Sequence, residues 1–389
     1  MTDEVRAYIW LTLQLNYNSI KISTVLSFFK TALAVWEADK SSLATIPGMR
    51  QVDLQALMDK DLSKAEFALV TCQKNNYKII TLDSPDYPER LFNILNPPHI
   101  LYVNGDIGGI DEQMCIGVVG TRGATDYGLR CARRLGKGLA SAGAVVVSGM
   151  ARGIDTAAQE GAIKGNGRTI AVLGCGLDIA YPSENEKLMV QIAQTGAVVS
   201  EYIPGTQPAG FHFPVRNRII SGLSLGVVVV EADRKSGALI TARHACEQGR
   251  DIFAIPGNID TPVSEGCNAL IKDGAILVTN LRDIVEEYIG ILPYELQDDE
   301  IKKHYMHTRE IKRDADPVIK SAPQLPADLT FEEASVMQVL LRGCQHIDVI
   351  VRECALPMQK VSSILMALEL RGDVAQLPGK QFLISQNGE

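Results

Sequence analysis

The chain has 389 residues, of which 46% are hydrophobic and 22% charged, as is usual for a globular protein of two or three domains. The formal net charge of −8 argues against a uniformly basic surface, although residues 116–260 carry 15 Lys and Arg against 12 Asp and Glu. No run of about 20 apolar residues occurs, and the N-terminus lacks a basic-then-apolar pattern. We therefore expect a cytoplasmic protein with no membrane association.

The eight cysteines include no CxxC pair. Four of them lie inside apolar or helical runs: Cys115, Cys131, Cys175 and Cys246. This placement is typical of reduced core residues rather than of metal ligands or disulfides. We expect no metal.

Residues 1–75 have helical periodicity and no strand pattern, so we predict a helical domain there. Residues 76–110 are rich in Pro and Asn, which excludes long regular elements. We interpret that segment as a connector.

From Cys115 onward, short apolar runs alternate with helical segments. The runs occupy 115–120, 144–149, 169–174, 197–201, 226–232, 251–256 and 275–279. The helical segments between them lie at about 128–141, 153–165, 184–195, 214–223, 237–248 and 265–272. Apolar strands alternating with helices predict an α/β fold, an extended Rossmann-like, doubly wound and mostly parallel sheet over residues 111–290. A ligand of such a sheet binds beyond the carboxyl ends of the strands.

The C-terminal part begins with residues 291–330, a mixed-charge, Pro-containing segment that we interpret as a linker. Residues 331–389 then predict three helices and a strand pair, the order of a winged helix. Its third helix, 358–371, offers only Lys360 and Arg371 as cations. Because readers of the major groove usually use several cations, we expect this module not to read DNA sequence.

Four loops that follow predicted strands are rich in Gly, Arg and small hydroxyl residues. Glycine lets backbone approach a ligand closely, helix N-termini attract anions, and Arg binds phosphate through two N–H groups. Together the loops predict a phosphate-binding site at one edge of the sheet. Its candidate residues in the first, second and third loops are Gly120, Thr121, Arg122, Ser148, Gly149, Arg152, Gly153, Phe213, Arg216, Asn217 and Arg218.

Aromatic residues stand beside the arginines of the third loop, in the sequence Phe211-His212-Phe213. Single-stranded nucleic acid is bound in this way, because exposed bases stack on rings while cations follow the backbone. An equally plausible interpretation is that each Phe packs against the start of the helix.

Dinucleotide binding is not supported, because the sequence LGCG supplies only Gly174 and Gly176 of the required three glycines. No P-loop, HExxH or GxSxG pattern occurs. Asp155, Glu201 and Glu231 stand where a hydrolase would place carboxylates. We favour structural roles: helix capping for Asp155, and holding a neighbouring arginine for the other two. We therefore expect no enzymatic activity and no cofactor.

Six stretches carry a specific resemblance: VVGTRGATDYG, VVVSGMARGIDTAAQEGAI, TIAVLGCGLDIAYPSEN, SEYIPGTQPAGFHFPVRNRIISGLS, VVVVEADRKSGALITARHACEQGRDIFAIPG and GCNALIKDGAILV. Together they cover about residues 85–280, and in this order they resemble the DprA/Smf (DNA processing protein A) family. The helical N-terminus resembles the SAM-like domain of that family. Residues 331–389 resemble its winged helix.

The resemblance implies binding of single-stranded DNA without base specificity, homodimers, and loading of the RecA recombinase in homologous recombination during natural transformation. It also implies that the loop residues named above form the phosphate pocket. One departure is Gln159, where many relatives have His. Gln cannot replace His as an acid or base, which favours a binding protein over an enzyme.

A second hypothesis is a Rossmann-like nucleoside-phosphate hydrolase, of the type that carries a PGGxGTxxE loop. The corresponding stretch, DRKSGALITARHACEQGR, lacks that Gly-rich turn. Turnover of nucleoside monophosphates would distinguish the two hypotheses.

Overall fold

The computed structural model describes residues 3–288, 329–377 and 379–385. The predicted linker, 291–330, lies almost entirely outside the described residues. By its internal contacts the chain divides into two compact units. The first comprises Met1–Tyr87, Asn96–Gly108 and Val172–Arg216, and the second Pro88–Leu95, Gly109–Ala171 and Asn217–Glu389.

The first unit begins with six helices, which confirms the helical character predicted for residues 1–75. They are α1 (Asp3–Gln14), α2 (Ser19–Phe29), α3 (Ala32–Glu37), α4 (Lys40–Leu43), α5 (Gln51–Met58) and α6 (Ser63–Asn75). The buried indole of Trp10 donates a hydrogen bond to the carbonyl of Asp59, 2.8 Å away. The Glu4 carboxylate accepts from the backbone N–H groups of Ala32 and Leu33, so it satisfies the start of α3.

Two strands of the first unit lie in the segment that we interpreted as a connector, so that interpretation is incomplete. The strands are β1 (Lys78–Thr81) and β2 (Ile100–Gly105), and β2 pairs antiparallel with β1 and with β6 (Ala197–Ser200). Prolines interrupt only the chain between β1 and β2, which leaves four and six residues free for pairing. The same unit contains η2 (Ser183–Asn185) and α10 (Glu186–Thr195).

Nine strands of the described residues form one sheet in the order β1-β2-β6-β5-β4-β3-β7-β8-β9. The second unit supplies its parallel pairs, β3 with β4 and β7, β4 with β5, β7 with β8, and β8 with β9. This confirms the predicted doubly wound, mostly parallel sheet. The bounds are β3 (Cys115–Val119), β4 (Val145–Ser148), β5 (Thr169–Leu173), β7 (Gly226–Val229), β8 (Asp251–Ala254) and β9 (Ile276–Leu277).

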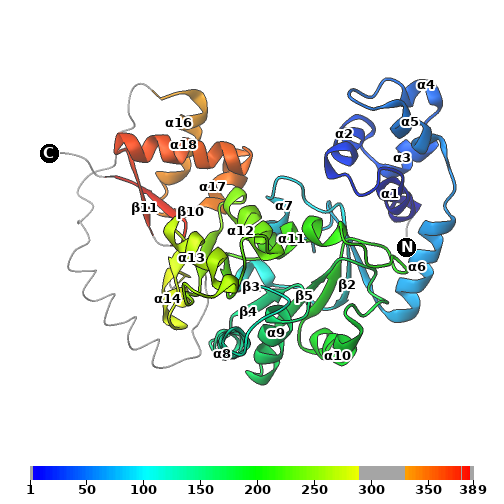
Figure 1. The fold of residues 1–389 in the computed structure, drawn as a ribbon. Coiled ribbons are helices and arrows are strands. Elements are labelled where there is room, and N and C mark those ends of the chain that lie inside the picture. The colour runs from blue at the N-terminus through cyan, green and yellow to red at the C-terminus, as the bar shows by residue number, and fades with distance from the viewer. Residues whose placement is uncertain (1–2, 289–328, 378, 386–389) are drawn as a thin grey trace. The chain divides into compact units, whose positions relative to one another are not determined.

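Helices cover both faces of the parallel strands: α8 and α9 lie on one side and α12 on the other (Figure 1). A Cβ on Gly136 would lie 2.1 Å from the carbonyl oxygen of Ala158, so glycine lets α8 and α9 pack closely. The helical segments are α7 (Glu89–Phe92), η1 (Ile110–Glu112), α8 (Asp126–Ser141), α9 (Ile154–Lys164), α12 (Gly237–Glu247), η3 (Pro262–Ser264), α13 (Glu265–Lys272), α14 (Arg282–Val285) and η4 (Glu286–Tyr288). Helix α11 (His212–Gly222) continues from the first unit into the second.

Two of the four cysteines expected in the core, Cys115 and Cys175, are buried. Cys131 is half-buried and Cys246 is exposed, so the prediction is wrong for Cys246. Cys246 lies in the last turn of α12, on the solvent-exposed side of the helix.

The C-terminal residues form the predicted winged helix. Its elements are α16 (Phe331–Leu340), β10 (Gln345–His346), α17 (Ile347–Cys354), α18 (Met358–Arg371), β11 (Val374–Leu377) and β12 (Gln381–Ile384). Strand β12 pairs antiparallel with both β10 and β11. Val361, Leu365 and Leu368 of α18 lie in a hydrophobic core that all three helices share.

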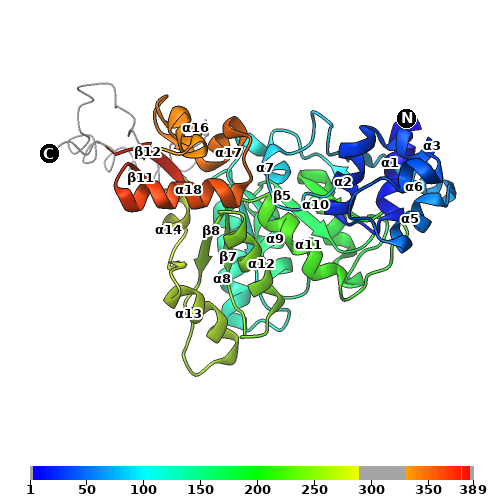
Figure 2. The same cartoon turned by 90° about the horizontal axis from the view of Figure 1, so that it is seen from above.

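The winged helix contacts the turn between α12 and β8, within the second unit. The guanidinium of Arg250, whose side chain is 1% exposed, donates to the Asp348 carboxylate at 2.7 Å and to the carbonyl of Arg90 at 3.1 Å. Arg352 of α17 pairs with Glu89 of α7 at 2.8 Å, and both views show these helices side by side (Figures 1 and 2). A buried ion pair therefore joins the winged helix to the sheet.

The ring of His346 caps α17, because its Nδ1 accepts the backbone N–H of Asp348 at 3.2 Å. Burial lowers the pKa of His346 from 6.5 to about 4, which keeps the ring neutral and Nδ1 able to accept. Between these two pH values the unfolded chain binds a proton that the folded chain does not. Stability that is full above pH 6.5 is therefore lost as the pH falls toward 4.

We predict that lowering the pH from 7 to 5 reduces the free energy of opening of α17 by about 2 kcal/mol, measured by hydrogen exchange of its amides. The control is His346→Asn, which keeps a capping oxygen but does not titrate. This variant should show little of the pH dependence. An equal loss in the wild type and the variant would contradict the assignment to His346.

Candidate nucleic-acid interface

The switch point of the sheet lies between β3 and β7, the adjacent strands from which the chain winds in opposite directions. Ligands of doubly wound sheets bind beyond the carboxyl ends of such strands. Here those ends lead into the loops 120–125 and 230–236. Two of the four loops from which the sequence predicts a phosphate-binding site therefore lie at the switch point.

A carboxylate of the protein already occupies the start of α8 at this point. Glu231 accepts hydrogen bonds from the backbone N–H of Thr125 at 2.9 Å and from its hydroxyl at 2.5 Å. A Cβ on Gly128 would lie 2.2 Å from the same carboxylate. The interpretation that Glu231 holds an arginine missed this contact. Because Glu231 neutralises the helix end, α8 does not offer the phosphate seat of a dinucleotide fold.

The first two candidate loops touch each other through glycine. Gly153 has φ +78°, and a Cβ there would lie 2.4 Å from the carbonyl oxygen of Thr121 and 2.8 Å from that of Arg122. The backbone N–H of Ile154 donates to the Thr121 carbonyl at 3.4 Å. The structure thus brings together the backbones of two predicted phosphate-binding loops. The side chains of Arg122 and Arg152, one on each loop, are exposed.

Two candidate residues of the second loop, Ser148 and Gly149, form hydrogen bonds within the protein. The hydroxyl of Ser148, fully buried, donates to the carbonyl of Val118 at 2.6 Å. The N–H groups of Gly149 and Ala151 donate to Asp155 at 3.1 and 3.4 Å. Asp155 therefore stabilises the loop that precedes α9. We had predicted that it caps the helix, and these hydrogen bonds show a different role.

The start of α11, in the first unit, carries an aromatic cluster. Phe213 stacks on Tyr181 with ring centroids 5.4 Å apart, and the Arg216 guanidinium lies 6.0 Å from the Phe213 ring. His212 stacks on Tyr202 at 4.1 Å. The predicted pairing of rings with a cation is present. Sequence reasoning missed the two tyrosines, because they lie 32 and 10 residues before their partners.

The polar candidate phosphate-binding residues of α11 are buried. Arg216, Asn217 and Arg218 are 3%, 9% and 8% exposed. The Arg216 guanidinium donates to the carbonyl of Val172 in β5, and Asn217 donates to the carbonyl of Gly237 at the start of α12, 3.2 Å away. These contacts position α11, whereas Arg122 and Arg152 present exposed cations.

The two cations of α18 are paired within the winged helix. Lys360 lies 2.9 Å from Glu332, and Arg371 lies 3.0 Å from Glu333 and 3.1 Å from Asp373. Such pairing leaves little positive charge for phosphate contacts and supports the prediction that this module does not read DNA sequence. No helix among the described residues is long and apolar enough to cross a membrane.

Fold and site define a Rossmann-like α/β protein with arginine-bearing loops at the switch point, joined to a winged helix. A family model described as DNA recombination-mediator protein A matches residues 78–289, and the DprA winged helix domain matches residues 320–380. The chain belongs to the DNA recombination-mediator protein A family, as its sequence resemblance implied.

Relatives match the chain over most of its length. Protein Smf of Escherichia coli is 36% identical over 376 residues, 95% of this chain and 94% of that protein. Protein Smf of Synechocystis is 36% identical over 361 residues, 89% of this chain and 90% of that protein. The X-ray structure of DNA processing protein A from Streptococcus pneumoniae matches with a TM-score of 0.64 and 37% identity, over 72% of this chain and 97% of that chain.

We predict that Gly153→Ala lowers the free energy of unfolding by about 2 kcal/mol or more, because the new Cβ meets Thr121 and the backbone has a positive φ. Gly123→Ala is the matched control in the neighbouring loop, where no heavy atom lies within 4 Å of the new Cβ. Denaturant unfolding of both variants measures the difference. Equal stability would mean that the two loops do not touch as described.

Proposed function

We propose that this chain binds single-stranded DNA without base specificity. The observation that carries the proposal is the contact between the loops of Arg122 and Arg152, two exposed residues that follow the carboxyl ends of β3 and β4. Guanidinium groups bind phosphates, which carry no base information. The aromatic cluster at the start of α11 supplies rings on which unpaired bases stack.

The residues of the proposed site divide by role. Arg122 and Arg152 contact phosphates, and Gly120, Thr121 and Gly153 shape the loops that carry them. Phe213 offers a stacking surface, with Arg216 beside it. Ser148, Gly149, Asn217 and Arg218 position the loops and α11 from below the surface.

A hydrolase is the less favoured function. Two of its three candidate acids accept hydrogen bonds from backbone groups: Asp155 from the loop before α9, and Glu231 from Thr125 at the start of α8. A carboxylate held in this way stabilises structure and is poorly placed to activate water. We therefore propose that the protein is not an enzyme, and that it turns over no nucleoside monophosphate.

The family description, a recombination mediator, supports a finer proposal. The chain loads the RecA recombinase onto single strands in the cytoplasm during natural transformation. The test is an assay of RecA ATP hydrolysis on strands coated with single-strand-binding protein. Adding this chain should shorten the lag before hydrolysis begins. An unchanged lag at saturating concentrations of this chain would contradict the loading role.

We also propose a homodimer, because a two-fold pair presents two linked sites to one strand and gains affinity through avidity. Light scattering at micromolar concentration should give twice the mass of one chain. A monomer at that concentration would count against the proposal.

We predict that Arg122→Ala and Arg152→Ala weaken binding of oligo-dT and of mixed-sequence strands equally. Each should make the log–log salt slope shallower by about 0.7, the share of one phosphate contact. Fluorescence anisotropy across a salt series measures both quantities. Both residues are exposed, and thermal unfolding of each variant checks that the fold is retained.

Two controls isolate the loops. Arg243→Ala removes an exposed cation from α12, and Lys360→Gln removes a paired cation from α18. Both should keep wild-type affinity and slope. If the loop variants also behave as wild type, the phosphates are bound elsewhere.

A further inference from the structure

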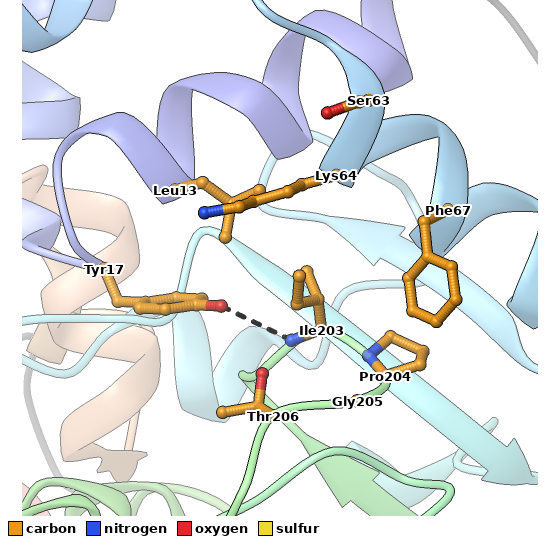
Figure 3. Close-up of a pocket in the computed structure, with 9 residues that line it drawn as sticks. All are labelled: Leu13, Tyr17, Ser63, Lys64, Phe67, Ile203, Pro204, Gly205 and Thr206. Atoms are coloured by element: carbon orange, nitrogen blue, oxygen red, sulfur yellow. Dashed lines mark hydrogen bonds between the residues drawn. The ribbon is translucent and has the colours of Figure 1, made fainter.

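A hollow lies in the first unit, away from the loops of Arg122 and Arg152 in the sequence. Its volume is about 450 Å³. It is lined by the end of α1, the start of α6 and the loop after β6 (Figure 3). The lining residues are Leu13, Tyr17, Ser63, Lys64, Phe67, Ile203, Pro204, Gly205 and Thr206. We call this hollow the α6 pocket.

The α6 pocket has aromatic walls. The ring of Phe67 is beside Pro204, and the Phe67 side chain is 54% exposed (Figure 3). A Cβ on Gly205 would lie 3.4 Å from this ring, so the loop backbone runs along the ring edge. On the opposite side, the hydroxyl of Tyr17 accepts the backbone N–H of Ile203 at 3.4 Å, which fixes the second ring.

A cation stands at the rim of the pocket. The Lys64 side chain reaches over the opening toward Leu13 and Tyr17 (Figure 3). Hydrogen bonds from Ser63 and the nearby charge of Lys64 lower the pKa of the exposed Asp61 carboxyl. Glu66 pairs with Arg6, and Asp178 accepts the backbone N–H of Gly205 at 2.8 Å. In the described part of the chain, Lys64 forms no ion pair. Its charge is available to an anion outside the protein.

A continuous series of rings joins the α6 pocket to the start of α11. Tyr17 contacts Tyr202 edge-on at 4.9 Å, Tyr202 stacks on His212 at 4.1 Å, and His212 contacts Phe211 at 4.5 Å. The Phe211 side chain is 71% exposed. The pocket is therefore connected through aromatic contacts to the aromatic cluster at the start of α11.

We propose that the α6 pocket is a further nucleotide subsite, which takes one unpaired base against Phe67 and the flanking phosphate at Lys64. The inference rests on the proposed binding of single-stranded DNA. A base offers a flat apolar face and its phosphate a charge, which matches the two features of the pocket. Bases of a duplex are stacked on each other and cannot enter, so the subsite favours single strands.

The test compares long and short oligo-dT on the full-length chain. Phe67→Ala should weaken a strand of about 20 nucleotides by about 5-fold or more, the effect of losing one stacked base. Lys64→Gln should make the salt slope for that strand shallower by about 0.7. A strand of about 6 nucleotides, which the loops of Arg122 and Arg152 can hold without the subsite, should bind all variants as it binds the wild type.

The chain offers matched controls for both substitutions. Phe28 is 50% exposed on α2 and does not line the pocket, so Phe28→Ala removes an equally exposed ring from the same unit. Lys74→Gln removes an exposed cation from the last turn of α6. Both control variants should bind long and short strands with wild-type affinity.

A direct readout comes from Phe67→Trp. The introduced indole should lose fluorescence when the long oligo-dT binds, and should not respond to an abasic strand of the same length, because only a base stacks on it. Phe28→Trp should respond to neither strand.

The outcomes separate this inference from the proposed function. If Arg122→Ala weakens binding of the long strand while the pocket variants bind normally and the indole is silent, the subsite is refuted and the proposed function stands. An indole that responds only to an apolar peptide would assign the pocket to a protein partner and refute the subsite. A wild-type chain that binds no single strand refutes both.

Discussion

The Glu231 carboxylate at the switch point determines how this fold presents charge. It accepts both hydrogen bonds from Thr125 and lies against Gly128, so it ties the end of β7 to the start of α8. In dinucleotide-binding relatives of this architecture, a ligand phosphate takes that place. Here the positive end of α8 is neutralised from within, and an anionic ligand must be bound by side-chain cations.

The contact between two loops at Gly153 determines where Arg122 and Arg152 lie. Gly153 lets the loop after β4 approach the backbone of Thr121, and Arg122 and Arg152 extend from the two adjoining loops. Asp155 and Ser148 hold the same region from inside through hydrogen bonds to backbone groups. A rigid support with exposed guanidinium groups suits a polymer of phosphates, because each contact adds affinity without selecting a base.

The sequence predicts the parallel sheet, because strands buried on both faces are apolar throughout and helices alternate with them. It does not predict β1 and β2, since strands of four and six residues flanked by prolines leave too short a pattern. The burial of Arg216 and Arg218 was also missed. The sequence around α11 does not show this burial, because it depends on packing against elements that are distant along the chain, such as β5 at Val172. The stacking of Tyr181 and Tyr202 was missed for the same reason.

Hydrogen exchange of the full-length chain with and without saturating oligo-dT tests the central claim most directly. We expect slower exchange in residues 120–123, in residues 150–153 and at the start of α11, with α18 unchanged. Slower exchange confined to α18, with these loops unaffected, would place the strand on the winged helix and contradict the account.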